Sequence, residues 1–148
     1  MRLFLDTNVL IDYISRRKPF YDFAKKLYIA SAFGDVKLFC STHSFLDAEY
    51  ILRHAIDIKQ LREIMAECCS FIQPVSIDVD SLKDGFFSGW PDLEDYAIAS
   101  AAMQVNADYL LTRDLAGFAD SKIPAMTPEE FFELLEKEYQ VVYDETEF

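Results

Sequence analysis

The feature that most constrains the fold is a regular alternation of short apolar segments with longer segments of helical periodicity. Strands that alternate with helices over short connections form parallel sheets covered on both faces. The pattern therefore predicts an α/β fold, a three-layer sandwich with a parallel sheet of four or five strands flanked by helices. The predicted strands are Leu3–Leu5, Val36–Cys40, Pro74–Ile77, residues 108–112 and a short strand near Ala125 and Met126. The predicted helices are Thr7–Ser15, Phe20–Phe33, a helix capped by Ser41, Thr42 or Ser44 that runs to about Ala55, Ile58–Phe71, Leu93–Val105 and Pro128 to about Tyr139. Residues Ser81–Phe87 are predicted as a short helix or a turn.

The length of 148 residues suits one domain with a sizeable core. We expect a single domain over residues 1–148. Residues 140–148 are a candidate C-terminal tail, which could be a strand, a disordered end or part of an interface. No apolar stretch approaches the roughly 20 residues that a bilayer span needs, and the first residues read as structure rather than as a secretory signal. We therefore expect a cytoplasmic protein without a membrane segment.

The charge balance limits how this chain can meet a nucleic acid. There are 26 acidic residues and 14 Lys and Arg residues, and the formal net charge is −12. Such a charge disfavours nonspecific binding to a phosphate backbone. A nucleic-acid function would require positive side chains, or bound cations, gathered at one site.

The thiols and imidazoles do not suggest a zinc site. The three cysteines form no CxxC pair and are odd in number, so we expect reduced thiols rather than native disulfides. The two histidines, His43 and His54, are few and far apart. His43 and Asp47 are four residues apart and could share a helical face, a spacing that polar residues at a helix start readily produce.

Acidic residues lie where the predicted strands end. Asp6 follows the first strand, and Asp114 comes just after the strand at 108–112. Parallel sheets bind ligands beyond the carboxyl ends of their strands, so both acids fall on the binding rim. Asp92 and Asp95 share one face at the start of the helix that leads into the fourth strand, and Asp47 lies in the first turns of the helix after the second strand.

Each acid alone has a simpler explanation. Asp6 could cap the first helix, Asp92 and Asp95 could form a capping box, and Asp114 could open a turn. Their conjunction on one rim favours a different interpretation, because several converging carboxylates repel one another by several kcal/mol unless a cation compensates them. Ligands that are all oxygen indicate Mg²⁺ or Mn²⁺, and such ions activate water and stabilise the developing charge in phosphodiester hydrolysis.

Four segments in this order resemble a known family, the PIN-domain ribonucleases, which include the VapC-type toxins of prokaryotic toxin–antitoxin pairs. They are "LFLDTNVLIDY", "DLEDYAIASAA", "ADYLLTRD" and "IPAMTPEEFF", and together they extend to about residue 135. The resemblance implies a divalent-metal-dependent endoribonuclease that acts on RNA, a cognate antitoxin as a protein partner, and a homodimer. It implies metal ligands at Asp6, Asp95 and Asp114, with Asp92 as an additional acid on the same face. Asn8 and Thr112 would be polar supports.

The sequence departs from the family at one acidic position. The family usually has a glutamate in the helix after the second strand, and the counterpart here is Asp47, whose shorter side chain would reach an ion through water. Glu49 points about 200° away from Asp47 on an ideal helix. This departure leaves open a noncatalytic PIN-like interaction module that binds a protein partner or RNA.

Basic residues near the rim are candidates for substrate contacts. Arg16, Arg17 and Arg113 could contact RNA phosphates or an acidic partner. The alternative for Arg16 and Arg17 is that they solubilise a helix end and interact favourably with its dipole. A haloacid-dehalogenase-like phosphatase is disfavoured because Asn8 occupies the position of its second aspartate, and the nucleotide-binding motifs GxGxxG and GxxxxGK[ST] are absent.

Overall fold

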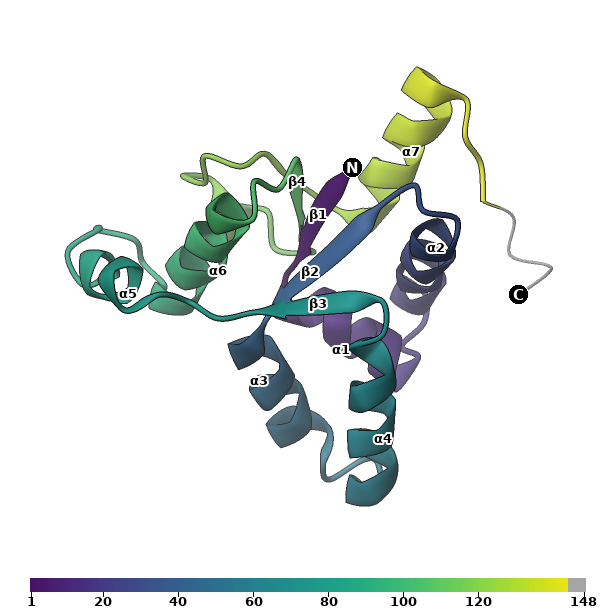
Figure 1. Cartoon of the computed structure of the whole chain (residues 1–148), viewed down its shortest axis with the longest axis horizontal. Helices are drawn as coiled ribbons and strands as arrows, with labels where there is room; N and C mark the ends of the chain where they lie inside the picture. The colour runs from purple at the N-terminus through teal and green to yellow at the C-terminus, as the bar shows by residue number, and fades with distance from the viewer. Residues whose placement is uncertain (144–148) are drawn as a thin grey trace.

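The sheet at the centre of the computed structural model, which describes residues 1–143, has five parallel strands (Figure 1). Their order is β3-β2-β1-β4-β5, so the chain starts in the middle of the sheet and builds outward in both directions. This confirms the predicted parallel sheet and its number of strands. The strands are β1 (Arg2–Leu5), β2 (Lys37–Ser41), β3 (Ile72–Val75), β4 (Tyr109–Leu111) and β5 (Ala125–Met126).

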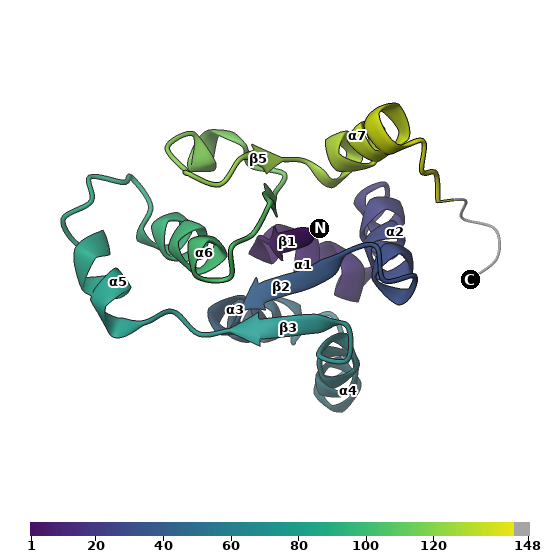
Figure 2. The same cartoon turned by 45° about the horizontal axis from the view of Figure 1, so that its top comes forward.

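The helices cover both faces of this sheet. In Figure 2, α6 and α2 lie on opposite sides of the central strands. No helix within residues 1–143 combines the length and the apolar character needed to cross a membrane. The helices are α1 (Thr7–Ser15), α2 (Phe20–Ala32), α3 (Thr42–Leu52), α4 (Ile58–Cys68), α5 (Val79–Gly85), α6 (Leu93–Gln104) and α7 (Pro128–Tyr139), with a 3₁₀ turn η1 (Ala116–Phe118).

Successive residues of each central strand point into two separate cores. In β1, Leu3 and Leu5 join the cluster beneath α1 to α4 and α7, whereas Phe4 joins the cluster beneath α6 and η1. In β4, Leu111 and Leu110 divide in the same way. Because both faces are buried, the strands read as continuous apolar runs and not as an alternation of apolar and polar residues. The two cores confirm the three-layer sandwich.

Short polar side chains define the starts of most helices. The side chains of Asp6, Ser41 and Asp92 each accept a hydrogen bond from a backbone N–H in the first turn of α1, α3 and α6. These caps satisfy donors that a helix start leaves without a partner. All three helices begin at the same rim of the sheet. α1 follows β1, α3 follows β2, and α6 precedes β4.

Four elements differ from the sequence prediction by two or three residues. α3 ends at Leu52 rather than near Ala55, and α5 spans Val79–Gly85 rather than Ser81–Phe87. The strand predicted at Pro74–Ile77 lies instead at Ile72–Val75, and the preceding helix ends at Cys68 rather than Phe71. Ile72 is buried and pairs with Leu38, which sets the register. β3 is an edge strand, where the missing N–H of a proline costs no ladder hydrogen bond.

The start of the predicted tail packs against the domain. Gln140 ends α7 in the left-handed conformation, and Tyr143 is buried with its hydroxyl donating to the Asp35 carboxylate. Burial and this contact with Asp35 raise the pKa of Tyr143. The rest of the predicted tail, residues 144–148, lies outside the described residues.

The two-sided core makes a direct stability prediction. Phe131 of α7 is fully buried, whereas Phe87 is 91% exposed. Phe131→Ala should lower the free energy of unfolding by about 3–5 kcal/mol because it leaves a cavity. Phe87→Ala, the matched control, should change it by less than about 0.5 kcal/mol. Urea unfolding followed by circular dichroism measures both, and equal effects would contradict the placement of α7.

Candidate active site

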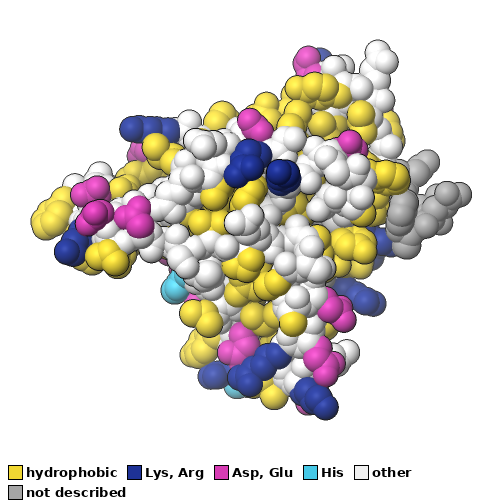
Figure 3. Space-filling model, in the orientation of Figure 1, with side chains coloured by type: hydrophobic (Ala, Val, Ile, Leu, Met, Phe, Trp, Pro, Cys, Tyr) yellow, Lys and Arg dark blue, Asp and Glu magenta, His cyan; other side chains and the backbone are white. Residues whose placement is uncertain are grey.

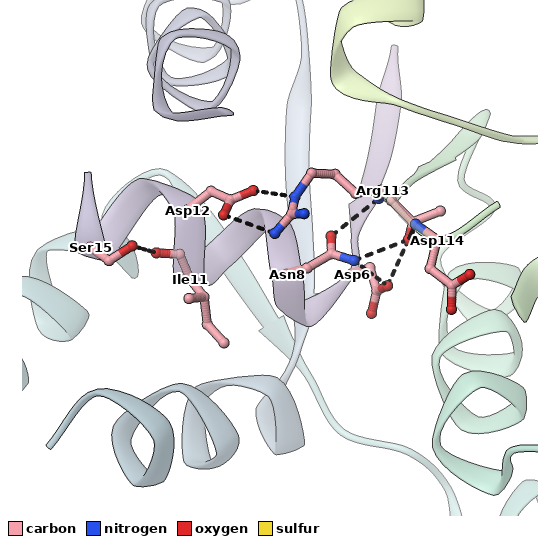
Figure 4. Close-up of polar contacts among 8 residues, drawn as sticks. Asp6, Asn8, Ile11, Asp12, Ser15, Arg113 and Asp114 are labelled. Carbon is pink, nitrogen blue, oxygen red and sulfur yellow. Dashed lines mark hydrogen bonds and ion pairs between the residues drawn. The ribbon is translucent and has the colours of Figure 1, made fainter. Parts of the chain in front are cut away.

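Asp6 stands where β1 ends and α1 begins, and it is only 7% exposed. Its Oδ1 accepts a hydrogen bond of 2.7 Å from the backbone N–H of Thr7. Its Oδ2 accepts one of 2.7 Å from the Thr112 hydroxyl and a longer one of 3.3 Å from the Asn8 amide (Figure 4). These donors hold one carboxylate in one orientation, so Asp6 both caps a helix and faces the rim.

Thr112 links this carboxylate to the next strand. The Thr112 side chain is fully buried, and its hydroxyl oxygen accepts a hydrogen bond of 2.9 Å from the backbone N–H of Asp114. β1 and β4 are paired with Leu5 opposite Leu111, which brings Asp114 to the same end of the sheet as Asp6. Figure 4 shows both carboxylates at this end of the sheet, and the charge of Asp114 contributes to the raised pKa of Asp6.

The start of α6 brings two further acids. Asp92 is the N-cap residue, and its Oδ1 accepts a hydrogen bond of 3.1 Å from the backbone N–H of Asp95. A Cβ atom added at Gly117 would lie 2.6 Å from Asp95 Oδ2 and 2.8 Å from Asp114 Oδ2. The carboxylates of Asp95 and Asp114 therefore meet over Gly117, a residue that sequence reasoning did not single out.

We call Asp6, Asp92, Asp95 and Asp114 the acid cluster, because their charges act on one another. Burial, and then the charges of Asp92, Asp6 and Asp114, raise the pKa of Asp95 to about 6. Burial is also the largest factor that raises the pKa of Asp6, with contributions from Asp114 and Asp92, and the hydrogen bonds from Thr112 and Thr7 act in the opposite direction. Four carboxylates with such mutual repulsion, two of them exposed to solvent, form an all-oxygen donor set that suits Mg²⁺ or Mn²⁺.

A family model described as "PIN domain" matches residues 2–116 of the sequence. The chain belongs to the PIN domain family. No curated protein matches it. Several solved structures share its fold at low identity. One is the structure of VapBC2 from Rickettsia felis bound to a promoter DNA fragment, with 17% identity and a TM-score of 0.62. The match covers 86% of this chain and 98% of the chain in that structure. The sarcin-ricin loop cleaving toxin VapC20 of Mycobacterium tuberculosis (11%, TM-score 0.63) covers 80% of this chain, over 94% of its own length. A toxin–antitoxin complex from Klebsiella pneumoniae (21%, TM-score 0.60) covers 85%, over 97% of its own length.

Asp47 of this PIN domain lies beside a different pair of side chains. Its Oδ2 is 3.3 Å from His43 Nε2, and Glu94 Oε2 is 3.8 Å from the same nitrogen. Burial, followed by the hydrogen bond and charge of Asp47, raises the pKa of Glu94 to about 7, whereas His43 lowers it. The sequence analysis did not predict Glu94, because only the fold brings the start of α6 next to α3.

Arg113 follows Thr112 but points away from the acid cluster (Figure 4). Its Nε and Nη2 donate to the two oxygens of Asp12 at 2.7 and 3.2 Å, and its guanidinium lies 3.9 Å from the centre of the Phe20 ring. Asp12 is 2% exposed, and burial raises its pKa although Arg113 lowers it. Arg113 therefore joins β4 to α1 and α2, and its contact with RNA stays a prediction.

Arg16 and Arg17 lie at the opposite end of α1 from Asp6. Arg16 adopts the left-handed conformation that ends the helix, and its N–H bonds to the carbonyls of the last turn. Nine helical residues separate the two ends by roughly 14 Å. The structure therefore does not bring Arg16 or Arg17 into the acid cluster.

The raised pKa of Asp95 predicts how pH acts on the metal-free protein. Its pKa rises from 3.8 to about 6 on folding, so between these values the unfolded chain releases the proton first and stability falls as pH rises. Asp95→Asn removes this cost. At pH 7 it should raise the free energy of unfolding by about 1 kcal/mol after solvent screening, and the melting temperature by about 3 °C.

Asp120→Asn is the control for this change, because Asp120 is an exposed aspartate outside the acid cluster. Thermal unfolding in the presence of a chelator, at pH 4 and pH 7, checks the prediction. The gain of Asp95→Asn should shrink at pH 4. A loss of stability at pH 7 would contradict the repulsion described above.

Gly117 predicts a change that affects the site without removing a carboxylate. In Gly117→Ala the new methyl group would force Asp95 and Asp114 apart. Mn²⁺ affinity, measured by calorimetry, should fall by about tenfold or more. Ala116→Ser, at the exposed preceding residue, should bind Mn²⁺ as the wild type does, and unchanged affinity in Gly117→Ala would contradict the close approach.

Proposed function

We propose that this PIN domain is a divalent-metal-dependent endoribonuclease, which hydrolyses RNA phosphodiester bonds at the acid cluster. The observation that carries the proposal is the convergence of Asp6, Asp95 and Asp114 from β1, α6 and the end of β4 at one rim of a parallel sheet. A scaffold has no physical need for acids that repel one another. A cation turns this repulsion into binding.

In this proposal Asp6, Asp95 and Asp114 hold Mg²⁺ or Mn²⁺, with Asp92 as an additional acid. The bound ion would supply a positive charge that activates water and stabilises the charge developing on the phosphate. The chain's own contribution is rigidity. Thr7, Asn8 and Thr112 fix Asp6 in place before any ligand arrives, so little reorganisation is needed on binding.

The charge of the protein fits a site in which the cation provides the attraction for RNA. The net charge is −12, and on the face in Figure 3 the Lys and Arg side chains lie in separate small groups and not in one continuous patch. Asp92 and Asp114 are exposed, so a phosphate can approach the acid cluster from solvent. Arg16, Arg17 and Arg113 are proposed to contact more distant phosphates, and Asp47 is proposed as a further catalytic acid at the edge of the site.

The solved structures with this fold suggest the setting of the reaction. They include a sarcin-ricin loop cleaving toxin and complexes of toxins with antitoxins. We propose that this chain is the toxin of such a pair, that a cognate antitoxin is its protein partner, and that it forms a homodimer. The cysteines Cys40, Cys68 and Cys69 are free thiols, which fits a reducing cytoplasm.

The test is cleavage of labelled single-stranded RNA with Mg²⁺, Mn²⁺ or a chelator. Wild type should cleave only with metal. Asp6→Asn and Asp95→Asn should lose at least about a hundredfold in rate, because each removes a charge that holds the ion. Asn at position 6 can still cap α1, so folding should be retained. Asp120→Asn is the matched control and should cleave like wild type.

Contaminating nuclease would give the same rate in every variant. If wild type and the two variants cleave alike, and Mn²⁺ leaves the melting temperature of wild type unchanged, catalysis is excluded. The result would then favour the noncatalytic interaction module, and the search would turn to a protein or RNA that the domain binds without cleaving.

A further inference from the structure

A second group of metal-ligand side chains lies beside the acid cluster, and it includes an imidazole. His43 and Asp47 are one turn apart at the start of α3, and Glu94 comes from the first turn of α6. His43 Nε2 lies 3.3 Å from Asp47 Oδ2 and 3.8 Å from Glu94 Oε2. One ligand atom from each of the three lies within 4.8 Å of the others. We call these residues the His43 triad.

Thr7 contacts both the acid cluster and the His43 triad. The Thr7 backbone N–H donates to Asp6, whereas the Thr7 hydroxyl lies 2.7 Å from the Ser44 hydroxyl and 3.5 Å from Glu94 Oε1. Glu94 and Asp95 are consecutive on α6, so their side chains diverge by about 100° around the helix. One helix start therefore supplies carboxylates to two neighbouring groups that point in different directions.

There is open space beside the triad. His43 and Glu94 line a hollow of about 340 Å³ where α3, α5 and α6 meet. The His43 side chain is 53% exposed, so an ion can reach Nε2 from solvent. The hollow would leave room for a water molecule or a small ligand to complete the coordination of an ion. Its apolar wall includes Ile77, Leu82, Leu93, Ala97 and Ile98.

We propose that the His43 triad binds a first-row transition-metal ion of the Zn²⁺ class, through His43 Nε2 and one oxygen each from Asp47 and Glu94. An imidazole with two carboxylates suits such an ion, whereas Mg²⁺ prefers oxygen ligands and keeps much of its water. Three protein ligands with an open position are the arrangement of reactive rather than structural zinc sites. The open position would accept an anionic oxygen, such as that of a phosphate group.

The proposed metal site uses none of the residues of the acid cluster, but it shares Asp47 with the proposed function, in which Asp47 is a further catalytic acid. The alternative role of the triad is an ion pair, in which a protonated His43 bridges two carboxylates without any metal. The two roles differ in one observable property, the response of the His43 imidazole to Zn²⁺.

The experiment titrates Zn²⁺ into the full chain with excess Mg²⁺ present to occupy the acid cluster. All proteins carry Cys69→Ser, because Cys69 is an exposed thiol that would itself bind zinc. The chain has two histidines, so the NMR spectrum contains two imidazole Hε1 signals, and His43→Gln identifies which one belongs to His43. His54→Gln is the matched control at an exposed histidine elsewhere.

The expected result is one equivalent of Zn²⁺ bound in wild type, in His54→Gln and in Asp6→Asn, with a shift of the His43 signal alone. His43→Gln should bind Zn²⁺ at least about tenfold more weakly while its Mg²⁺ binding is retained. Equal Zn²⁺ affinity in wild type and His43→Gln, or a His43 signal that does not move, would overturn the proposal. Loss of the Zn²⁺ site in Asp6→Asn would also overturn it, because the ion would then belong to the acid cluster.

Discussion

The repulsion among carboxylates at one end of a parallel sheet is the constraint on which the rest of this structure depends. Asp6 is nearly buried at the junction of β1 and α1, where an uncompensated charge is costly. Hydrogen bonds from Thr7, Asn8 and Thr112 partly stabilise the charge of this carboxylate. The charges of Asp6, Asp95 and Asp114 still repel one another, and a bound divalent ion would relieve this repulsion.

The parallel topology explains why the acids converge. The chain starts in the central strand, so its first carboxylate emerges in the middle of the rim, and β4 adds Asp114 next to it. The crossover helices α3 and α6 begin at the same rim, because each follows or precedes a strand of the same direction. The parallel order of the strands therefore brings together side chains that are more than 100 residues apart in the sequence.

Local patterns were sufficient to predict much of this arrangement. α1 was predicted with its observed bounds because the cap at Asp6 and the polar end after Ser15 are both local signals. The strands that precede Asp6 and Asp114 were also recognisable, since strands buried on both faces are continuous apolar runs. β3 was misplaced by two residues because Pro74 reads as the start of a strand. A proline inside β3 is tolerated because β3 lies at the edge of the sheet, which only the tertiary structure shows.

Contacts between distant segments could not be predicted in the same way. The pair of Arg113 with Asp12 and the approach of Glu94 to His43 join residues that no spacing rule relates. Gly117 is a similar case, because the need for a missing side chain there arises only when Asp95 and Asp114 are both in place. The sequence thus predicted which residue types reach the rim, and the tertiary structure determined how they divide between the two groups.

The pairing of Arg113 with Asp12 has a consequence for the order of events at the site. The cation nearest to the acid cluster in sequence is held by another carboxylate and by the Phe20 ring, so it does not neutralise the cluster. A phosphate that arrives at the metal-free rim meets net repulsion, whereas a small cation meets attraction. Under the proposed function, binding would therefore be sequential, with the ion first and the RNA second. The free concentration of divalent ions would then set the fraction of molecules that are competent to take up RNA.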